Sequence, residues 1–226
     1  MKGFFITGTD TSVGKTVLSA LLCAALDGYY WKPIQTGARE GTDRQQVLAW
    51  SGIKPEDAFP EAYLFDDPVS PHLAAQRSGA TICLDKIAMP ATNGNRPLIV
   101  EGAGGVLVPI NEDEYMTDVM RHIGLPVILA TRTTLGTINH TLLSLEELRS
   151  AQLTVHGVVM LGEANHDNQR AIEHYGRVPV LGIVPQLSEI NPLTLKQVFV
   201  ACFDCQVLME DWVKLTSKRE IKNRKP

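Results

Sequence analysis

Hydrophobic and polar positions follow two alternating patterns along the chain. Short apolar runs, such as Phe4-Phe5-Ile6 and Leu98-Ile99-Val100, are separated by longer stretches whose apolar residues recur every three or four positions. Short continuous apolar runs are typical of strands buried on both faces, and the longer spacing is typical of helices that cover a sheet. The pattern therefore predicts an α/β protein with a doubly wound, mostly parallel sheet.

The expected elements alternate along one domain that spans residues 1–226. The strands are Gly3–Thr7, Tyr29–Lys32, Leu98–Glu101, Val127–Thr131, His156–Leu161 and Val180–Val184. The helices are Lys15–Leu26, Asp43–Ser51, Pro71–Arg77, Tyr115–His122, Ile138–Ala151, Asn168–Tyr175 and Pro192–Cys205. We expect the segment from Gly52 to Pro71 to be a surface excursion, because it is rich in Pro, Asp and Glu.

Polar and glycine-rich segments follow the first four of these strands. They are residues 8–16, 32–37, 101–105 and 131–139. Ligands of doubly wound sheets bind beyond the carboxyl ends of the strands. The sequence therefore predicts a binding site at this edge of the sheet.

The first of these segments, Gly8 to Thr16, reads as a phosphate-binding loop of the P-loop NTPase type. It has five residues between its two glycines, where the common motif has four, and it ends in an intact Gly14-Lys15-Thr16. Backbone N–H groups at the start of the following helix would face a polyphosphate. Lys15 would reach the β- and γ-phosphates, and the Thr16 hydroxyl would bind Mg²⁺. The segment therefore predicts nucleotide binding.

Three further side chains are candidates for phosphoryl-transfer chemistry. Glu101 ends a buried strand at the position where a carboxylate holds Mg²⁺ in these folds. Lys32 also ends a strand and could neutralise transferring phosphate, although a surface lysine would read the same way. Asp43 is either a third metal ligand or a simple N-cap, since it follows Thr42 at a predicted helix start.

Composition and charge exclude several classes of function. A net charge of −4 argues against nucleic acid or an anionic membrane as the main partner. No apolar stretch approaches the ~18 residues of a membrane span, and we see no signal peptide, so we expect a cytoplasmic protein. Cys202 and Cys205 are interpreted as buried core rather than as a metal or redox pair. The sequence predicts a disordered basic tail at about residues 216–226.

Several motifs occur together in the order of one enzyme family. They are residues 8–16, Lys32-Pro33 with Thr36-Gly37, Ser70-Pro71-His72, Val100 to Gly105, and Leu135-Gly136 with Ile138-Asn139-His140. In this combination, which extends from Gly3 to Pro185, the chain resembles the dethiobiotin synthetases.

The resemblance implies a Mg-ATP-dependent ligase of biotin biosynthesis. Its substrates would be 7,8-diaminononanoate, CO₂ and a nucleoside triphosphate, and its product would carry the ureido ring of dethiobiotin. One amine would form a carbamate, and the carbamate would attack the γ-phosphate to give a carbamic–phosphoric anhydride. The second amine would then close the ring and expel phosphate.

The resemblance also implies roles for individual residues. The catalytic residues would be Lys32, Lys15 and Thr11. The metal ligands would be Thr16, Asp43 and Glu101. Nucleotide contacts would come from Ser12, Val13, Gly14, Lys15, Thr16, Val17, Asp43, Glu101, Gly102, Ala103, Gly104, Pro185, Gln186 and Leu187. Substrate contacts would come from Thr11, Thr36, Gly136, Thr137 and Ile138. In this family the substrate site is completed across a homodimer interface, so a homodimer is implied.

The chain departs from the family pattern at three places. Ser12 replaces a frequent glutamate, which should matter little in a loop that works through its backbone. Leu161 and Gly162 stand where many relatives carry an asparagine that reads adenine, so we expect weak discrimination among bases. The tyrosine that reaches the partner's substrate in some relatives has no clear equivalent, since Tyr175 lies too late in the chain.

A different class of function is a nucleotide-driven switch of the partition or septum-placing type. These ATPases share the fold and a related loop, but their loop carries an early signature lysine where this chain has Asp10. Together with the acidic net charge, Asp10 favours the enzyme.

Overall fold

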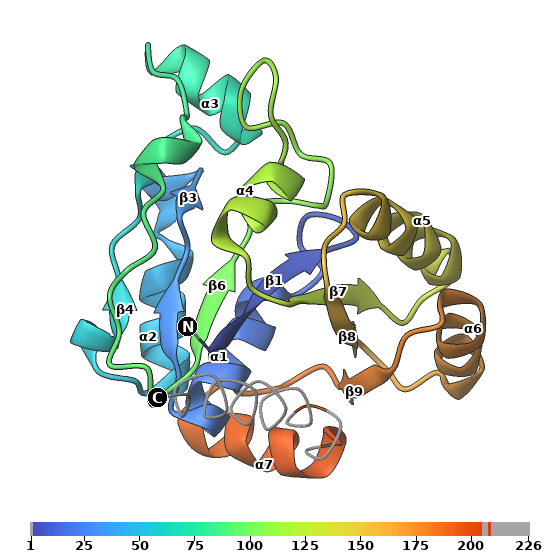
Figure 1. Ribbon diagram of the computed structural model, residues 1–226. Coiled ribbons are helices and arrows are strands. Elements are labelled where there is room, and N and C mark those ends of the chain that lie inside the picture. Colours follow the sequence, from blue (N-terminus) through green and yellow to red (C-terminus); the bar gives the residue numbers. More distant parts are fainter. Residues whose placement is uncertain (1, 205–207, 209–226) are drawn as a thin grey trace, which may run out of the picture.

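The structure is a computed structural model that describes residues 2–204 and 208 of the 226-residue chain (Figure 1). Its main sheet has seven strands in the order β4-β2-β6-β1-β7-β8-β9. Their bounds are β1 Gly3–Gly8, β2 Tyr29–Trp31, β4 Ala58–Phe59, β6 Leu98–Glu101, β7 Val127–Arg132, β8 Val155–Leu161 and β9 Val180–Val184. All the strand pairs of this sheet are parallel, as the apolar runs predict.

Helices cover both faces of the sheet. On one face, an apolar core joins the sheet to α1 (Lys15–Leu26), α2 (Asp43–Ser51) and α7 (Pro192–Cys202). On the other face, a second core joins it to α3 (Pro71–Arg77), α4 (Met116–Ile123), α5 (Thr137–Ser150) and α6 (His166–Gly176). The strand β1 lies at the centre with all six residues buried, which is why its sequence is continuously apolar.

The expected fold class is confirmed, and the expected strands and helices are present with small shifts at their ends. The bounds of β6, β9, α1, α2 and α3 are as predicted. The strand β2 ends at Trp31, so Lys32 is the first residue beyond the strand. The helix α6 begins at His166 because Asn165 caps it, its side-chain oxygen accepting the N–H of Asn168 at 3.0 Å.

Residues 52–71 are mostly exposed or half-buried, as expected of a surface excursion, but they also contain two strands that the sequence did not predict. Ala58 is buried in β4, the edge strand beside β2, and Phe65 is buried beyond β5 (Tyr63–Leu64). The strand β5 pairs with β3 (Ile34–Gln35) in a separate two-stranded sheet. Two-residue strands are too short to show a period of two in the sequence, so the pattern could not reveal them. Through the pairing of β5 with β3, this segment holds the chain that follows Lys32 in place.

The predicted helix Pro192–Cys205 ends earlier than expected. Its last residue is Cys202, and Phe203 turns to an extended conformation that bridges Gly182 of β9. Cys202 packs against the core on the α1 face, as predicted, but its side chain is only partly buried, and Cys205 lies outside the described residues. The predicted tail, residues 216–226, lies outside them too. Within the described part of the chain, no helix is long and apolar enough to cross a membrane.

Candidate active site

The phosphate-binding loop joins the buried end of β1 to the start of α1. Val13 is buried in the core beneath α1 and anchors the loop. Gly14 has a left-handed backbone with φ 99°, and a Cβ atom there would lie 2.4 Å from Leu161 Cδ2. Only glycine fits such a position without strain. The first turn of α1 begins directly afterwards, with the N–H groups that such turns leave unpaired.

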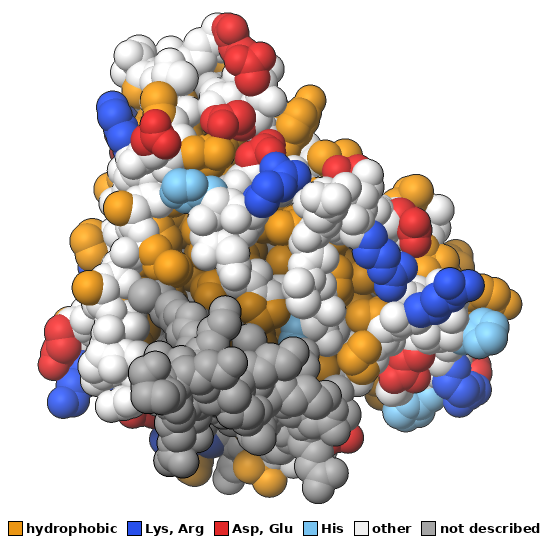
Figure 2. Space-filling model, in the orientation of Figure 1, with side chains coloured by type: hydrophobic (Ala, Val, Ile, Leu, Met, Phe, Trp, Pro, Cys, Tyr) orange, Lys and Arg blue, Asp and Glu red, His pale blue; other side chains and the backbone are white. Residues whose placement is uncertain are grey.

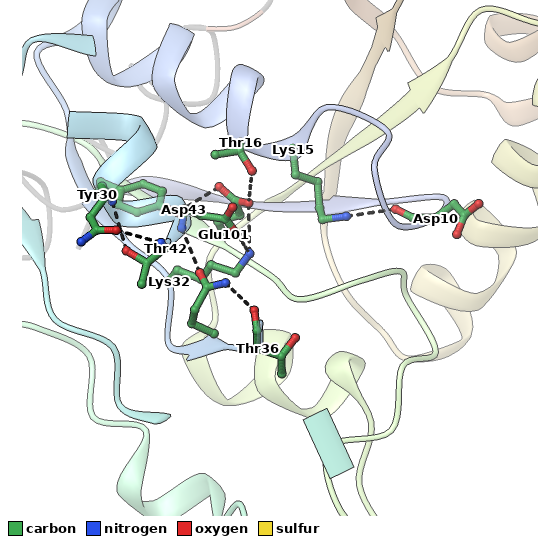
Figure 3. Close-up of polar contacts among 11 residues, drawn as sticks. Asp10, Lys15, Thr16, Tyr30, Lys32, Thr36, Thr42, Asp43 and Glu101 are labelled. Carbon is green, nitrogen blue, oxygen red and sulfur yellow. Dashed lines mark hydrogen bonds and ion pairs between the residues drawn. The ribbon is translucent and has the colours of Figure 1, made fainter. Parts of the chain in front are cut away.

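Lys15 lies inside this loop rather than in solvent. Its ammonium group donates a hydrogen bond to the backbone carbonyl of Asp10 at 2.9 Å, so the loop closes around the side chain (Figure 3). Burial lowers the pKa of Lys15 to about 8, against the opposing attraction of Glu101. A polyphosphate would supply the negative charge that this buried ammonium group lacks.

Glu101 accepts hydrogen bonds from three other side chains of the site. Its Oε1 accepts hydrogen bonds from the Thr16 hydroxyl at 2.9 Å and from the Lys32 ammonium group at 3.3 Å. Its Oε2 accepts a hydrogen bond from the Tyr30 hydroxyl at 3.0 Å. Because β2, β6 and β1 are neighbours in the sheet, the residues at their carboxyl ends meet around this one carboxylate (Figure 3). Glu101 itself is 1% exposed.

Lys32 bridges the two carboxylates of the site. It forms ion pairs with Asp43 and with Glu101 Oε1, and it is buried. Burial by itself would lower the pKa of Lys32, but Glu101 and Asp43 together outweigh it and raise the pKa. The lysine therefore remains a cation, and the reading of Lys32 as a surface residue is excluded.

Asp43 is not the N-cap of α2. The cap is Thr42, whose hydroxyl accepts the N–H of Gln45 at 3.2 Å, while Gln45 Oε1 accepts the N–H of Thr42 at 3.0 Å. This capping box leaves the Asp43 carboxylate available to Lys32. Gln35 of β3 connects the start of α2 to the segment after β3. Its side chain accepts a hydrogen bond from the N–H of Asp43 at 3.1 Å and donates one to the carbonyl of Thr36 at 2.7 Å.

The donor set suits Mg²⁺. The Thr16 hydroxyl and the two carboxylates present only oxygen atoms, and the carboxylates of Asp43 and Glu101 already surround one cation, the ammonium group of Lys32. Across the described residues, no three His, Cys, Asp or Glu side chains converge as an all-protein metal cage would require. A small set of oxygen donors that leaves room for water and phosphate is the arrangement Mg²⁺ uses.

The other side of the loop is lined by the segment after β7. Arg132 donates a hydrogen bond to the carbonyl of Thr11 at 3.3 Å, and its guanidinium lies 3.7 Å from the carboxylate of Asp10. The buried hydroxyls of Thr131 and Thr137 bond to each other at 2.8 Å and fix the start of α5. The N–H of Thr137 donates a hydrogen bond to the carbonyl of Thr134. A carboxylate bound here would therefore need the other N–H groups of this turn.

The structure brings some of the predicted site residues together directly. Lys15, Thr16, Lys32, Asp43 and Glu101 form one region, and the glycine-rich turn after Glu101 approaches the backbone of the phosphate-binding loop.

Other predicted residues lie farther from Glu101. Thr11 is exposed, and its N–H donates a hydrogen bond to Asp10 Oδ1 at 2.6 Å, while Gln35 links Thr36 to Asp43. Residues 185–187 follow β9, which is three strands from β1, or ~14 Å at the usual strand spacing. Leu187 packs against the core that contains Val13, on the face of the sheet that α1 covers.

Sequence reasoning missed Tyr30, Gln35, Thr42 and Arg132. Two signals were available. Residues 30 and 32 are two apart in the predicted strand Tyr29–Lys32, which would place them on one face, and Thr42 and Gln45 have the spacing of a capping box. The roles of Gln35 and Arg132 depend on contacts between distant segments, which a single sequence does not show.

Comparison with known proteins gives the family. A family model described as an AAA domain matches residues 2–194. The ATP-dependent dethiobiotin synthetase BioD of Rhodopseudomonas palustris (strain HaA2) is 46% identical over 210 residues, which are 93% of this chain and 98% of that protein. The chain belongs to the dethiobiotin synthetase family. The BioD of Brucella melitensis biotype 2 is also 46% identical, over 88% of this chain and 92% of its own length.

Similar solved structures share the fold. In the MinC:MinD cell division protein complex of Aquifex aeolicus, the matched chain aligns with a TM-score of 0.55 and 16% identity, covering 96% of both chains. The cell division ATPase MinD of Pyrococcus furiosus aligns with a TM-score of 0.53 and 16% identity, covering 95% of this chain and all of that one. At this identity the likeness shows a common fold, while the close sequence relatives are dethiobiotin synthetases.

Proposed function

We propose that this chain closes the ureido ring of dethiobiotin from 7,8-diaminononanoate and CO₂ at the expense of a nucleoside triphosphate. The observation that carries the proposal is the contact of the buried Lys32 with Asp43 and Glu101 beside the phosphate-binding loop, in a chain of the dethiobiotin synthetase family. Phosphoryl transfer needs fixed cations and a metal-binding carboxylate within reach of a triphosphate.

The nucleotide would be held mainly through its phosphates. Residues 12–17 would supply backbone N–H groups and the Lys15 ammonium group, and residues 102–104 would border the same space. Thr16, Asp43 and Glu101 would hold Mg²⁺, which when bound supplies charge neutralisation to the β- and γ-phosphates. Residues 185–187 would form the rim of the base pocket.

Lys32 and Thr11 would act on the carbamate. A carbamate oxygen attacks the γ-phosphorus, the bond to the nucleoside diphosphate breaks, and a carbamic–phosphoric anhydride forms. The second amine then attacks the carbonyl carbon, loses a proton and expels inorganic phosphate. Lys15 and Lys32 would neutralise the phosphoryl charge during transfer, and Thr11 and Thr36 would orient the carbamate.

The substrate carboxylate would bind at the start of α5, near residues 136–138. This turn carries an exposed leucine, Leu135, and the outer face of α5 carries Leu143, which is also exposed. In the family that the chain resembles, the substrate site is completed across a homodimer interface, and exposed leucines here would supply apolar contacts to a partner. We assign them to a homodimer in which the partner completes the substrate site.

Nucleic acid and membranes are not proposed as partners. Figure 2 shows Lys and Arg side chains scattered among acidic and apolar ones on this face, rather than gathered into a basic stripe. Polyanion binding depends on such a stripe. A cytoplasmic location fits the dependence on nucleoside triphosphate.

The proposal is tested by phosphate release from the purified chain. Release should require the nucleotide, 7,8-diaminononanoate and bicarbonate together, and omission of any one should stop it. Lys15→Ala and Lys32→Ala should each lower kcat by at least ~100-fold, the effect of removing one fixed charge from such a site. Near-normal rates in either variant would remove that lysine from the mechanism. Equal release without the diamine would mark a simple nucleotidase.

A further inference from the structure

The carboxylate of Glu101 is divided between two sets of partners. Oε1 faces the functional groups, Thr16 and Lys32, and Oε2 faces Tyr30. Both Tyr30 and Glu101 are essentially inaccessible to solvent, at 0% and 1% exposed. Among the residues that the structure describes, the Tyr30 hydroxyl donates the hydrogen bond to Oε2. Because both groups are buried, water cannot easily replace this donor.

The register of the sheet explains why Tyr30 reaches Glu101. In the parallel pairing of β2 with β6, Tyr30 lies opposite Ile99, and Glu101 follows two residues later on the same face. The Tyr30 ring packs in the core beneath α1 and α2, so its hydroxyl has little freedom. Tyr29 points to the opposite face, where its ring lies tilted by 34° to the ring of Phe59, with the ring centroids 5.7 Å apart.

We propose that Tyr30 is a positioning residue for the metal site: its hydroxyl holds Glu101 Oε2 so that Oε1 stays directed toward Thr16 and the phosphates. This role rests on the proposed nucleotide- and metal-dependent phosphoryl transfer. Groups that hydrogen-bond a metal-binding carboxylate from behind typically change metal affinity by about 10- to 100-fold when they are removed. Tyr30 would act only through Glu101 and would touch neither metal nor substrate.

The test measures metal binding without turnover. Mn²⁺ is titrated into the full chain saturated with the non-hydrolysable analogue adenylyl imidodiphosphate, and free Mn²⁺ is followed by its electron paramagnetic resonance signal. Tyr30→Phe keeps the packed ring and removes the hydroxyl, so Mn²⁺ should bind about 10- to 100-fold more weakly. The matched control Tyr29→Phe removes the neighbouring hydroxyl on the other face of the sheet and should leave the Mn²⁺ affinity unchanged.

Steady-state kinetics gives a second readout. In Tyr30→Phe the apparent KM for Mg²⁺ should rise by a similar factor, and kcat should recover at saturating Mg²⁺, a separation that a general loss of stability would not produce. Equal Mn²⁺ affinity in Tyr30→Phe and wild type would overturn the proposal, as would a Tyr30→Phe chain that cannot fold, since the hydroxyl would then be structural. Failure of wild type to bind Mn²⁺ with the analogue would instead overturn the proposed metal site itself.

Discussion

At the scale of the residue, Lys15 is expected to couple nucleotide binding to the uptake of a proton. Burial lowers its pKa to about 8, so its charged form is lost as the pH rises through 8. A bound polyphosphate would restore the charge, so binding at pH 9 should take up ~0.9 proton per site. Calorimetry at pH 9 in two buffers of different ionisation enthalpy measures this uptake. Lys15→Ala should abolish it, and equal uptake in wild type and variant would show that another group is responsible.

The same pKa shift affects stability in a defined direction. The unfolded chain binds the Lys15 proton more tightly than the folded chain does, because the folded pKa is lowered from 10.5 to about 8. The contribution of Lys15 to the free energy of unfolding therefore increases as the pH rises between these two values.

Because Leu161 stands where many relatives carry an asparagine that reads adenine, we expect weak discrimination among nucleotide bases. It ends β8 with its side chain against Gly14, and Asn165, the nearest asparagine that follows, uses its side-chain oxygen to cap α6. Sites that read a hydrogen-bonding edge discriminate by about 10⁴, which an apolar side chain cannot provide. We expect the kcat/KM values for ATP, GTP and CTP to lie within about tenfold of one another. A hundredfold preference for ATP would contradict this prediction.

At the scale of the element, α2 is capped where the chemistry needs it fixed. Thr42→Ala removes the cap that leaves Asp43 facing Lys32, and it should lower the free energy of unfolding by ~1 kcal/mol. It should also reduce kcat roughly tenfold, since even small misplacements of catalytic groups are costly.

Asn191→Ala is the matched control for this prediction. Asn191 caps α7 by accepting the N–H of Thr194 at 2.9 Å, and the start of α7 packs against Gly52, at the end of α2 remote from Asp43. Thermal denaturation should show a similar loss of stability in both variants, with kcat reduced only in Thr42→Ala. A similar kcat in the two variants would mean that the α2 cap has no catalytic role.

The sequence predicts the elements that carry a clear period or a motif. Strands such as β1 and β6 are long enough to show as apolar runs, and Lys15 and Thr16 are placed by the glycine loop itself. The strands β3, β4 and β5 escape prediction because two residues show no period. The spacing of Tyr30 and Lys32 places them on one face of the predicted strand, but the contacts of Tyr30 with Glu101 and of Gln35 with Asp43 form only when the chain has folded.

At the scale of the whole molecule, the exposed Leu135 and Leu143 mark the proposed homodimer interface. Leu135→Asp places a charge there and should convert a dimer to a monomer in sedimentation experiments, because interface cores exclude charged groups. The KM for the diamine should rise while the nucleotide affinity stays unchanged.

Val200→Asp provides the control for the interface. Val200 is also exposed, but it lies on α7, which covers the opposite face of the sheet. This variant should sediment as the wild type does. A Leu135→Asp chain that remains a dimer would place the interface elsewhere.

The most direct measurement of the proposed reaction follows the carbon of CO₂. The chain is incubated with ¹⁴C-bicarbonate, 7,8-diaminononanoate and Mg-ATP, and the mixture is then acidified to expel CO₂ and destroy carbamates. We predict acid-stable radioactivity, from the carbon of the ureido ring, equal to the inorganic phosphate released. Phosphate release without acid-stable radioactivity would contradict the assignment of ring closure to this site.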